Sequence, residues 1–177
     1  MKVLNPYLSC MENTNNTLEM NKTMNAIGLE TEHNEELCFT LNELLANYQI
    51  FYMNVRGFHW NIKGKKFFEL HVKFEELYDD LQLKIDEVAE RILTLGGTPL
   101  HTFTDYLSAS EIKPVKNASD ANETVNSLLE SFKIQLIKQR QILDLSAKAN
   151  DEGTNALMSD YIREQEKLVW MYSSFMK

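Results

Sequence analysis

Two pairs of potential metal ligands lie in one long segment of helical period, and the residues of each pair are four positions apart. The first pair is His71 and Glu75, and the second is Asp86 and Glu90. On a helix, side chains at this spacing lie one above the other and can share a metal ion. Iron accepts imidazole and carboxylate ligands, often with open positions for an oxidant. Acidic residues at this spacing are also common on solvated helix faces, so the pairs alone leave that simpler interpretation open.

The direction of these four side chains follows from the apolar pattern of the same segment. At about 100° per residue, the four lie within roughly a 100° arc of the helical wheel. The apolar residues recur at steps of three and four and are centred about 130° away from that arc. These residues are Phe67, Leu70, Phe74, Leu77, Leu81, Ile85, Val88, Ile92 and Leu95. We therefore expect the potential ligands to point away from the core of their own chain.

One chain cannot bring both pairs to a single ion. The midpoints of the pairs are 15 residues apart, or about 22 Å along a helix that rises ~1.5 Å per residue, whereas metal–ligand bonds are about 2 Å long. A second copy lying antiparallel across a two-fold axis would place the first pair opposite the second and would create two identical sites. The same face carries three apolar residues that suit a buried interface: Phe68, Val72 and Leu83. The spacing thus predicts a site shared between two chains.

The chain divides into a polar beginning and one helical domain. Residues 1–32 are rich in Asn, Thr and Met, show no sustained period and are expected to form a flexible leader. Residues 33–177 are expected to form a single domain. Its apolar period covers the ranges 37–58, 67–95, 125–143 and 157–175.

Turn and capping residues separate these four stretches. Gly96-Gly97 followed by Pro99 ends the second stretch, because Gly tolerates a left-handed cap and Pro cannot continue the helix. Asp120 opens the third. Residues 98–118 form a long connection with a short helix near Tyr106-Leu107. These features predict an all-α fold, a ferritin-like four-helix bundle with a short helix in the long connection between helices 2 and 3.

Composition and charge argue against a nucleic-acid-binding, disulfide-stabilised or membrane protein. The formal net charge of −8 disfavours contact with nucleic acid phosphates and anionic membranes and favours cations. Two cysteines, Cys10 and Cys38, do not make a disulfide framework, and Cys38 is expected to be a small buried residue. No segment approaches the ~20 apolar residues needed to span a bilayer, and residues 1–9 lack the apolar run of a signal peptide. We therefore expect no membrane contact and a cytoplasmic location.

A longer motif links these residues to a known family. His59, His71, Glu75, Asp86 and Glu90 follow one another with eleven, three, ten and three residues between them. The stretches around them are His59-Trp60-Asn61-Ile62-Lys63-Gly64, Asp86-Glu87-Val88-Ala89-Glu90-Arg91 and Gly96-Gly97-Thr98-Pro99. In this motif, and over the range from about Glu35 to Met176, the sequence closely resembles the Dps proteins, mini-ferritins of the ferritin-like superfamily.

The resemblance implies an iron-oxidising and iron-storing protein. Dps proteins are dodecamers of four-helix subunits around a hollow core. They are ferroxidases that oxidise Fe(II), preferably with hydrogen peroxide, and store the ferric product as mineral. Because both Fenton reactants are consumed, this activity protects against oxidative damage. Each ferroxidase site takes two irons.

The resemblance also assigns the ligands to subunits. His59, His71 and Glu75 would come from one subunit, and Asp86 and Glu90 from its two-fold partner. The imidazoles would hold the tighter iron, and Glu90 is placed to bridge the two irons. Position 75 is often Asp in the family, and the longer Glu can change the relative affinities for the two irons.

For two residues of the motif, a purely structural role remains an alternative to a role in the iron site. Trp60 neighbours the site and could donate an electron to trap a radical, but an aromatic residue packed at the interface fits the pattern equally. His59, taken without the resemblance, fits a structural histidine.

The sequence departs from many Dps proteins in its tails. Residues 1–33 carry Lys2 and Lys22 against four glutamates, and Lys177 alone follows the last helix. Because phosphate neutralisation needs several cations at once, we predict weak or no DNA binding, against the alternative of a DNA-compacting protein. The three-fold pores of the family are lined by acids ahead of the last helix, and Asp151 and Glu152 are the candidates here, although Ala147 and Ala156 stand where some relatives have Asp.

A third hypothesis is an iron site enclosed within one bundle. Such sites use Glu-x-x-His pairs on helices that face the core. The sequence offers this spacing at Glu30 and His33, where no second pair accompanies it.

Overall fold

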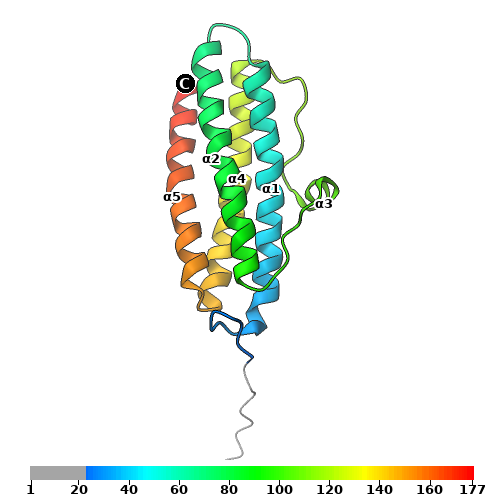
Figure 1. Ribbon diagram of the computed structural model, residues 1–177. Coiled ribbons are helices and arrows are strands. Elements are labelled where there is room, and N and C mark those ends of the chain that lie inside the picture. Colours follow the sequence, from blue (N-terminus) through cyan, green and yellow to red (C-terminus); the bar gives the residue numbers. More distant parts are fainter. Residues whose placement is uncertain (1–22) are drawn as a thin grey trace, which may run out of the picture.

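The computed structural model describes residues 23–177, which form a bundle of four long helices and one short helix. In chain order the elements are the 3-10 helix η1 (Thr31–His33) and the α-helices α1 (Asn34–Asn61), α2 (Phe67–Thr94), α3 (Phe103–Ala109), α4 (Ala121–Lys148) and α5 (Glu152–Phe175) (Figure 1). The predicted all-α bundle with a short helix between helices 2 and 3 is confirmed. No helix within residues 23–177 is both long and apolar enough to cross a membrane.

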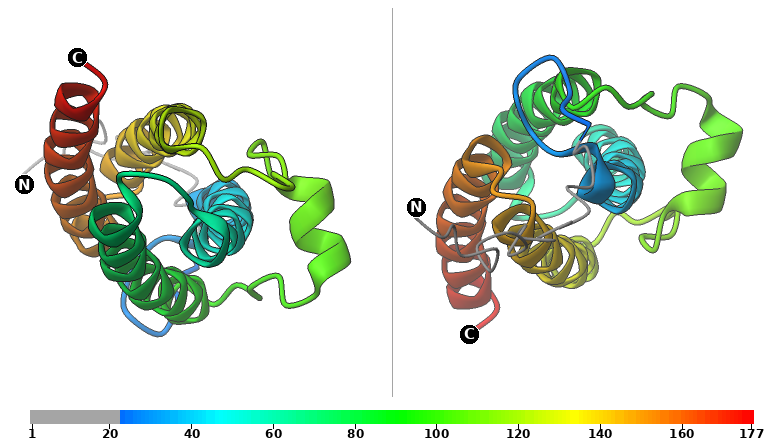
Figure 2. Two further views of the ribbon diagram at one scale, coloured as in Figure 1. Left: turned by 90° about the horizontal axis from the view of Figure 1, so that it is seen from above. Right: turned by 90° about the horizontal axis from the view of Figure 1, so that it is seen from below.

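The long helices surround one core. Helix α1 packs against α2 and α4, and α4 packs against α5. Figure 2 shows the four helices around a common centre, with α3 outside them on the side of α1. The short helix therefore covers part of α1 and leaves the outer face of α2 open.

The apolar seam of α2 is buried as its period predicted. Seven of its nine residues are buried: Leu70, Phe74, Leu77, Leu81, Val88, Ile92 and Leu95. The other two, Phe67 and Ile85, are partly buried against the same core. Each buried side chain of this size contributes about 2 kcal/mol by leaving water. This burial fixes the rotation of α2, and so it decides which side chains face outward.

The predicted helix ends are present, each with a local cause. Gly96 takes the left-handed conformation at φ +91°, which costs Gly little. Gly97 is needed for space, since a Cβ there would lie 2.8 Å from Cys38 Sγ. Cys38 itself is half-buried. At the start of α4, Asp120 Oδ1 accepts hydrogen bonds from the backbone N–H groups of Asn122 (2.9 Å) and Glu123 (3.0 Å), as an N-cap does.

Three asparagines of α1 hold the long connection against the bundle. Asn42 Oδ1 accepts a hydrogen bond from the backbone N–H of Leu100 at 2.7 Å. Asn47 Oδ1 accepts one from Glu111 at 2.8 Å, and Asn54 Oδ1 accepts one from Val115 at 2.9 Å. Because these amides satisfy the backbone of an irregular segment, the connection follows α1 along much of its length.

The predicted leader of residues 1–32 falls in two parts. Residues 1–22 lie outside the described residues. Residues 23–30 form a turn closed by an antiparallel bridge between Met24 and Glu30, and residues 31–32 belong to η1. The Asn25 side chain organises this turn, because its Oδ1 accepts hydrogen bonds from the backbone of Ile27 (3.1 Å) and Leu29 (2.9 Å).

A buried ion pair ties α2 to the start of α5. Arg91 Nη2 donates to Asp151 Oδ1 at 2.5 Å, and Arg91 Nε donates to Thr154 Oγ1 at 2.8 Å. Asp151 also caps α5 by accepting from the backbone of Thr154 at 3.0 Å. Asp151 is 2% exposed, so its assignment to a pore lining was wrong: the carboxylate faces Arg91 inside the chain. Glu152 is exposed.

The pKa of Asp151 reflects this pairing. Burial alone would raise it, but the hydrogen bonds from Arg91 and Thr154 outweigh burial and hold the pKa of Asp151 below its ordinary value. The stabilising contribution is therefore complete above the ordinary aspartate pKa of about 3.9 and is lost as the pH falls through the lowered folded value.

Asp151→Asn should lower the free energy of unfolding by about 2 kcal/mol at neutral pH, because Arg91 loses its buried counter-charge. Urea unfolding at several pH values measures this effect, and the loss should shrink in acid. Glu152→Gln is the matched control, since it removes one charge from the neighbouring exposed position. Equal stability of Asp151→Asn and wild type at neutral pH would show that the pair contributes nothing.

Candidate metal centre

The turn between α1 and α2 brings His59 and His71 into contact. His59 is in the last turn of α1 and is 9% exposed. The two imidazole rings are stacked, with centroids 3.8 Å apart and planes inclined by 20°. His59 Nδ1 lies 2.8 Å from the backbone oxygen of His71, and His71 Nδ1 lies 2.9 Å from the backbone oxygen of His59. Each histidine therefore holds the other helix in place.

These reciprocal hydrogen bonds define how each ring can bind a metal. A carbonyl oxygen only accepts, so each Nδ1 must carry the hydrogen. In a neutral imidazole the lone pair is then on Nε2. Metal-binding histidines are commonly oriented in this way, with one ring nitrogen bonded to a carbonyl and the other free for the ion. Both rings thus have the tautomer that a metal ligand needs.

Glu75 lies one helical turn after His71 and is exposed. Its Oε1 accepts a long hydrogen bond of 3.5 Å from the hydroxyl of Tyr78. The carboxylate is otherwise open to solvent and free to turn toward the histidine pair. His59 and His71, which are in contact, and Glu75, one helical turn away, are the predicted ligands of this candidate half-site.

Asp86 and Glu90 are also exposed on α2, but they lie farther along the helix. Within the part of the chain that the structure describes, no three His, Cys, Asp or Glu side chains come together closely enough to hold a metal ion. The structure thus brings His59 and His71 into contact, and it groups neither Glu75 nor the second carboxylate pair with them closely enough to hold a metal.

The half-site is flanked by an aromatic cluster that the sequence analysis missed. The cluster is Tyr52, Arg56 and Tyr78. The Arg56 guanidinium lies 5.5 Å from the ring centroids of both Tyr52 and Tyr78 and 4.9 Å from that of Trp60. Tyr78 meets the His59 ring edge-on at 5.3 Å. The spacing could have revealed Tyr78, because it is three residues after Glu75 and seven after His71, on the same helix face.

The environment of Tyr78 keeps it in the phenol form. Desolvation, and after it the Glu75 carboxylate, raise the pKa of Tyr78 above its ordinary value. Its hydroxyl therefore carries its hydrogen at neutral pH and can donate to Glu75.

Large exposed apolar side chains lie at the α1–α2 turn and along α2. The exposed fractions are 57% for Trp60, 84% for Phe68, 48% for Val72 and 66% for Leu83. Exposed apolar area of this kind is typical of an interaction surface. The outward face of α2 therefore combines polar ligands with the apolar area that an interface needs.

The centre of the bundle holds uncharged polar side chains, whereas an iron site enclosed in the bundle would need carboxylate ligands there. Tyr48 accepts hydrogen bonds at its hydroxyl from Gln139 Nε2 (2.8 Å) and Gln165 Nε2 (2.7 Å). Gln139 also donates to Gln165 Oε1 at 3.0 Å. Amides and a phenol lack the negative charge that carboxylate ligands supply, and the Glu30–His33 spacing precedes α1. The geometry therefore disfavours the hypothesis of a site within one bundle.

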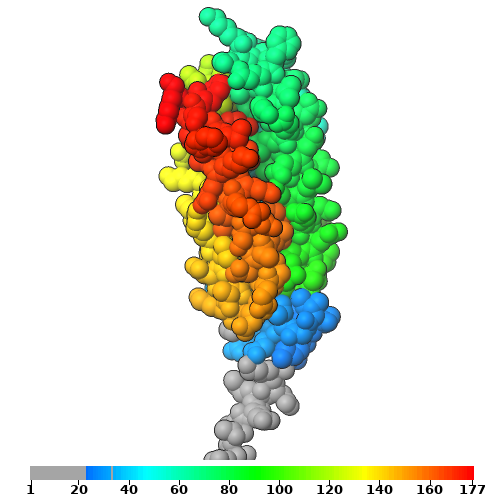
Figure 3. All heavy atoms as spheres, turned by 90° about the vertical axis from the view of Figure 1, so that its left-hand side faces the viewer, coloured from blue at the N-terminus to red at the C-terminus, as the bar shows by residue number. Residues whose placement is uncertain are grey.

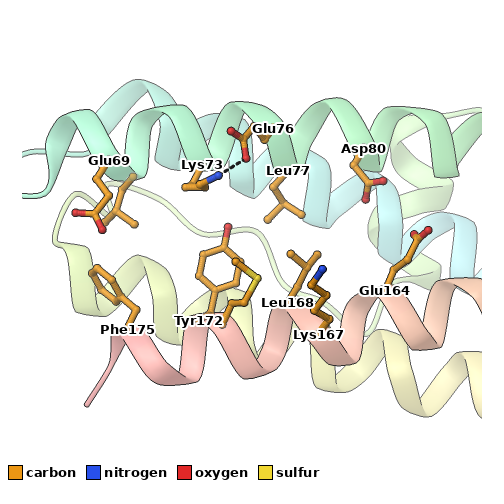
Figure 4. Close-up of a pocket in the computed structure, with 12 residues that line it drawn as sticks. Glu69, Lys73, Glu76, Leu77, Asp80, Glu164, Lys167, Leu168, Tyr172 and Phe175 are labelled. Carbon is orange, nitrogen blue, oxygen red and sulfur yellow. Dashed lines mark hydrogen bonds and ion pairs between the residues drawn. The ribbon is translucent and has the colours of Figure 1, made fainter.

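A groove of about 480 Å³ runs between α2 and α5, on a different face of α2 from the ligands. Figure 3 shows this side of the molecule, with α5 alongside α2. In Figure 4, Lys73 and Glu76 of α2 pair with each other, at 2.6 Å, above a floor that includes Tyr172 of α5. None of the predicted ligands lines the groove. The candidate metal centre is therefore an open surface half-site rather than a pocket.

The comparisons with known proteins agree with this geometry. The family model of the ferritin-like domain matches residues 40–177. A DNA protection during starvation protein from Porphyromonas gingivalis is 43% identical over 156 residues, which are 88% of this chain and 98% of that protein. A crystal structure of a Dps protein from Bacillus brevis has a TM-score of 0.80 at 34% identity and covers 82% of this chain and 97% of that chain.

A solved structure from Vibrio cholerae O1 is more similar. It is described as a Dps protein and as a member of a broad superfamily of ferritin-like diiron-carboxylate proteins. Its TM-score is 0.86 at 58% identity, and the match covers 87% of this chain and 97% of that chain. Fold and matches together define a ferritin-like protein. Within that superfamily, the chain belongs to the Dps family.

The apolar rim leads to a prediction about association. Leu83→Glu should leave the helical content unchanged, because the side chain is 66% exposed, but it should weaken self-association by burying a charge in an apolar interface. Sedimentation velocity with circular dichroism measures both properties. Gln141→Glu, on the exposed side of α4, adds the same charge elsewhere and serves as control. A Leu83→Glu protein with the mass of the wild-type assembly would contradict the assignment of this face.

Proposed function

We propose that this protein is an iron-oxidising and iron-storing mini-ferritin. It oxidises Fe(II), preferably with hydrogen peroxide, at ferroxidase sites between subunits, and it stores the ferric mineral inside a hollow dodecamer in the cytoplasm. Membership of the Dps family supports iron storage and protection from oxidative damage in general. The observation that carries the finer proposal is the reciprocal histidine pair, which leaves two imidazole Nε2 atoms free at a surface rimmed by apolar side chains.

The two half-sites have different chemistry. His59 and His71 supply two neutral nitrogen donors, and Glu75 adds one negative charge. This set suits a first Fe(II) and leaves coordination positions open. Asp86 of the partner subunit and Glu90 of the partner subunit would add two carboxylates, which favour Fe(III) over Fe(II) because they neutralise more charge. Glu90 of the partner subunit is the proposed bridge between the two irons.

The shared site follows from the rigidity of α2. The helix is continuous from Phe67 to Thr94, so the distance between the carboxylate pair and the histidine half-site cannot close within one chain. An antiparallel α2 from a second copy brings the pairs together and buries the apolar rim, including Leu83, in the same contact. Assembly and iron binding are therefore coupled in this proposal.

Two adjacent irons would allow peroxide to be reduced without release of hydroxyl radical. Hydrogen peroxide takes two electrons to form two hydroxide ions, and each Fe(II) supplies one of them. When both irons react together, the O–O bond breaks without release of hydroxyl radical. The protein contributes proximity of the two Fe(II) ions, and the carboxylates stabilise the charge that develops on oxidation.

DNA compaction is the less favoured function. Phosphate binding depends on several clustered cations, and each contact releases counterions. The chain has a formal net charge of −8. We therefore propose weak or no DNA binding for the isolated protein, in line with the expectation from its tails.

The double substitution His59→Ala and His71→Ala should slow Fe(II) oxidation by about 100-fold, because loss of groups that only orient a metal ligand already costs about 10–100-fold in affinity or activity. The test loads Fe(II) without oxygen, adds hydrogen peroxide and follows the ferric absorbance. His101→Ala is the matched control, since His101 is exposed outside the half-site. Oxidation at the wild-type rate in the double variant would reject the assignment of the histidines.

A further inference from the structure

The centre of the bundle holds four uncharged polar side chains that come from three helices. Tyr48 lies on α1, Gln135 and Gln139 lie on α4, and Gln165 lies on α5. Each of them is at most 2% exposed. Polar groups buried this deeply normally have hydrogen-bond partners, because an unpaired donor or acceptor has lost its bonds to water without replacement. Every donor and acceptor of this set should therefore be paired.

Three of the four side chains bond to one another and still leave a donor and an acceptor over. The Tyr48 hydroxyl accepts from Gln139 Nε2 at 2.8 Å and from Gln165 Nε2 at 2.7 Å, which fills both lone pairs of its oxygen. Gln139 Nε2 also donates to Gln165 Oε1 at 3.0 Å, and turning over either amide alone would oppose two like groups there. Within residues 23–177, no acceptor receives the hydrogen of the Tyr48 hydroxyl and no donor reaches Gln139 Oε1.

Gln135 adds a second unpaired amide to the same region. Its Nε2 and Oε1 atoms are both buried, and neither has a hydrogen-bond partner in the described part of the chain. Gln135 precedes Gln139 by four residues on α4, so the two side chains lie one above the other on the same helix face. The face of α4 that contributes Gln139 to the cluster therefore also carries unpaired polar atoms one helical turn away.

The unpaired atoms specify the chemistry of a ligand. The ligand must both donate and accept, because the Tyr48 hydroxyl offers a hydrogen, Gln139 Oε1 needs one, and the Gln135 amide has groups of each kind. Burial raises the pKa of Tyr48 above its ordinary value, so the phenol keeps its hydrogen and adds no charge. The ligand must be neutral as well, since a buried ion without a counter-charge is costly. Water meets these conditions, and buried waters make about three hydrogen bonds to groups that are otherwise unpaired.

We propose that the centre of the bundle binds a water molecule between Gln135, Gln139 and Tyr48. The water accepts the hydrogen of the Tyr48 hydroxyl and donates to Gln139 Oε1. Its remaining hydrogen bond is to the Gln135 amide. The water joins α1 to α4 and completes the hydrogen bonds of the neutral cluster, so it is a structural ligand of the bundle. This inference goes beyond the proposed ferroxidase function and does not depend on it.

A high-resolution crystal structure of the full-length protein tests the site directly. It should show a density peak within about 3.2 Å of both Gln139 Oε1 and a Gln135 amide atom. Gln135→Met keeps the length of the side chain but removes the amide, and it should lose this peak. Gln141→Met makes the same change on the exposed side of α4 and should keep it. A wild-type structure without the peak overturns the inference, even if Gln135→Met does not fold.

Two solution measurements separate a bound water from an amide that is buried dry. Magnetic relaxation dispersion of isotopically labelled water should detect an additional long-lived water per chain in Gln141→Met compared with Gln135→Met. Gln135→Met should also unfold at a lower urea concentration than Gln141→Met, because loss of the water leaves Tyr48 and Gln139 unpaired. Equal numbers of long-lived waters in the two variants would contradict the site. A more stable Gln135→Met would also contradict it, since removing a dry, unpaired amide relieves its burial cost.

Discussion

Two hydrogen bonds between imidazoles and backbone carbonyls join the end of α1 to the start of α2. His59 Nδ1 bonds to the carbonyl of His71, and His71 Nδ1 bonds to that of His59. These bonds satisfy backbone oxygens near the turn, set both ring tautomers and stack the rings at 3.8 Å. Tyr78 packs on the His59 ring that they fix. The local fold and the proposed metal chemistry therefore depend on the same pair of contacts.

The centre of the bundle is lined by neutral polar groups, whereas the predicted carboxylate ligands lie on the outer face of α2. Inside, Tyr48 and two glutamines form a neutral hydrogen-bonded cluster, which costs little to bury because its main groups are paired. Outside, Glu75, Asp86 and Glu90 are exposed on α2. A carboxylate is costly to bury without a counter-charge. In the proposed shared site iron would supply that charge, so metal binding and burial of this face would support each other.

The sequence was sufficient for the features that depend on periodicity. The seam from Phe67 to Leu95 fixed the rotation of α2, and helix rise fixed the separation of its two ligand pairs, since both follow from regular helix geometry. The cap at Asp120 and the stop at Gly96-Gly97 were predictable for the same reason. Contacts between helices could not be predicted from the sequence. The tautomer of His59, the asparagine contacts to the connection and the pairing of Asp151 with Arg91 depend on which helices pack together. Asp151 was a candidate pore residue because of its place ahead of the last helix, but its pairing with Arg91 buries it inside the chain.

The central claim is that each iron site takes ligands from two chains. Co-assembly of two defective variants tests it most directly: one carries His59→Ala and His71→Ala, and the other carries Asp86→Asn and Glu90→Gln. In a mixed two-fold pair, one of the two sites receives all five native ligands. Random mixing should therefore restore about a quarter of the wild-type peroxide-dependent Fe(II) oxidation, although each variant alone is inactive. Mixed assemblies, verified by mass, that stay inactive would contradict a site shared between chains.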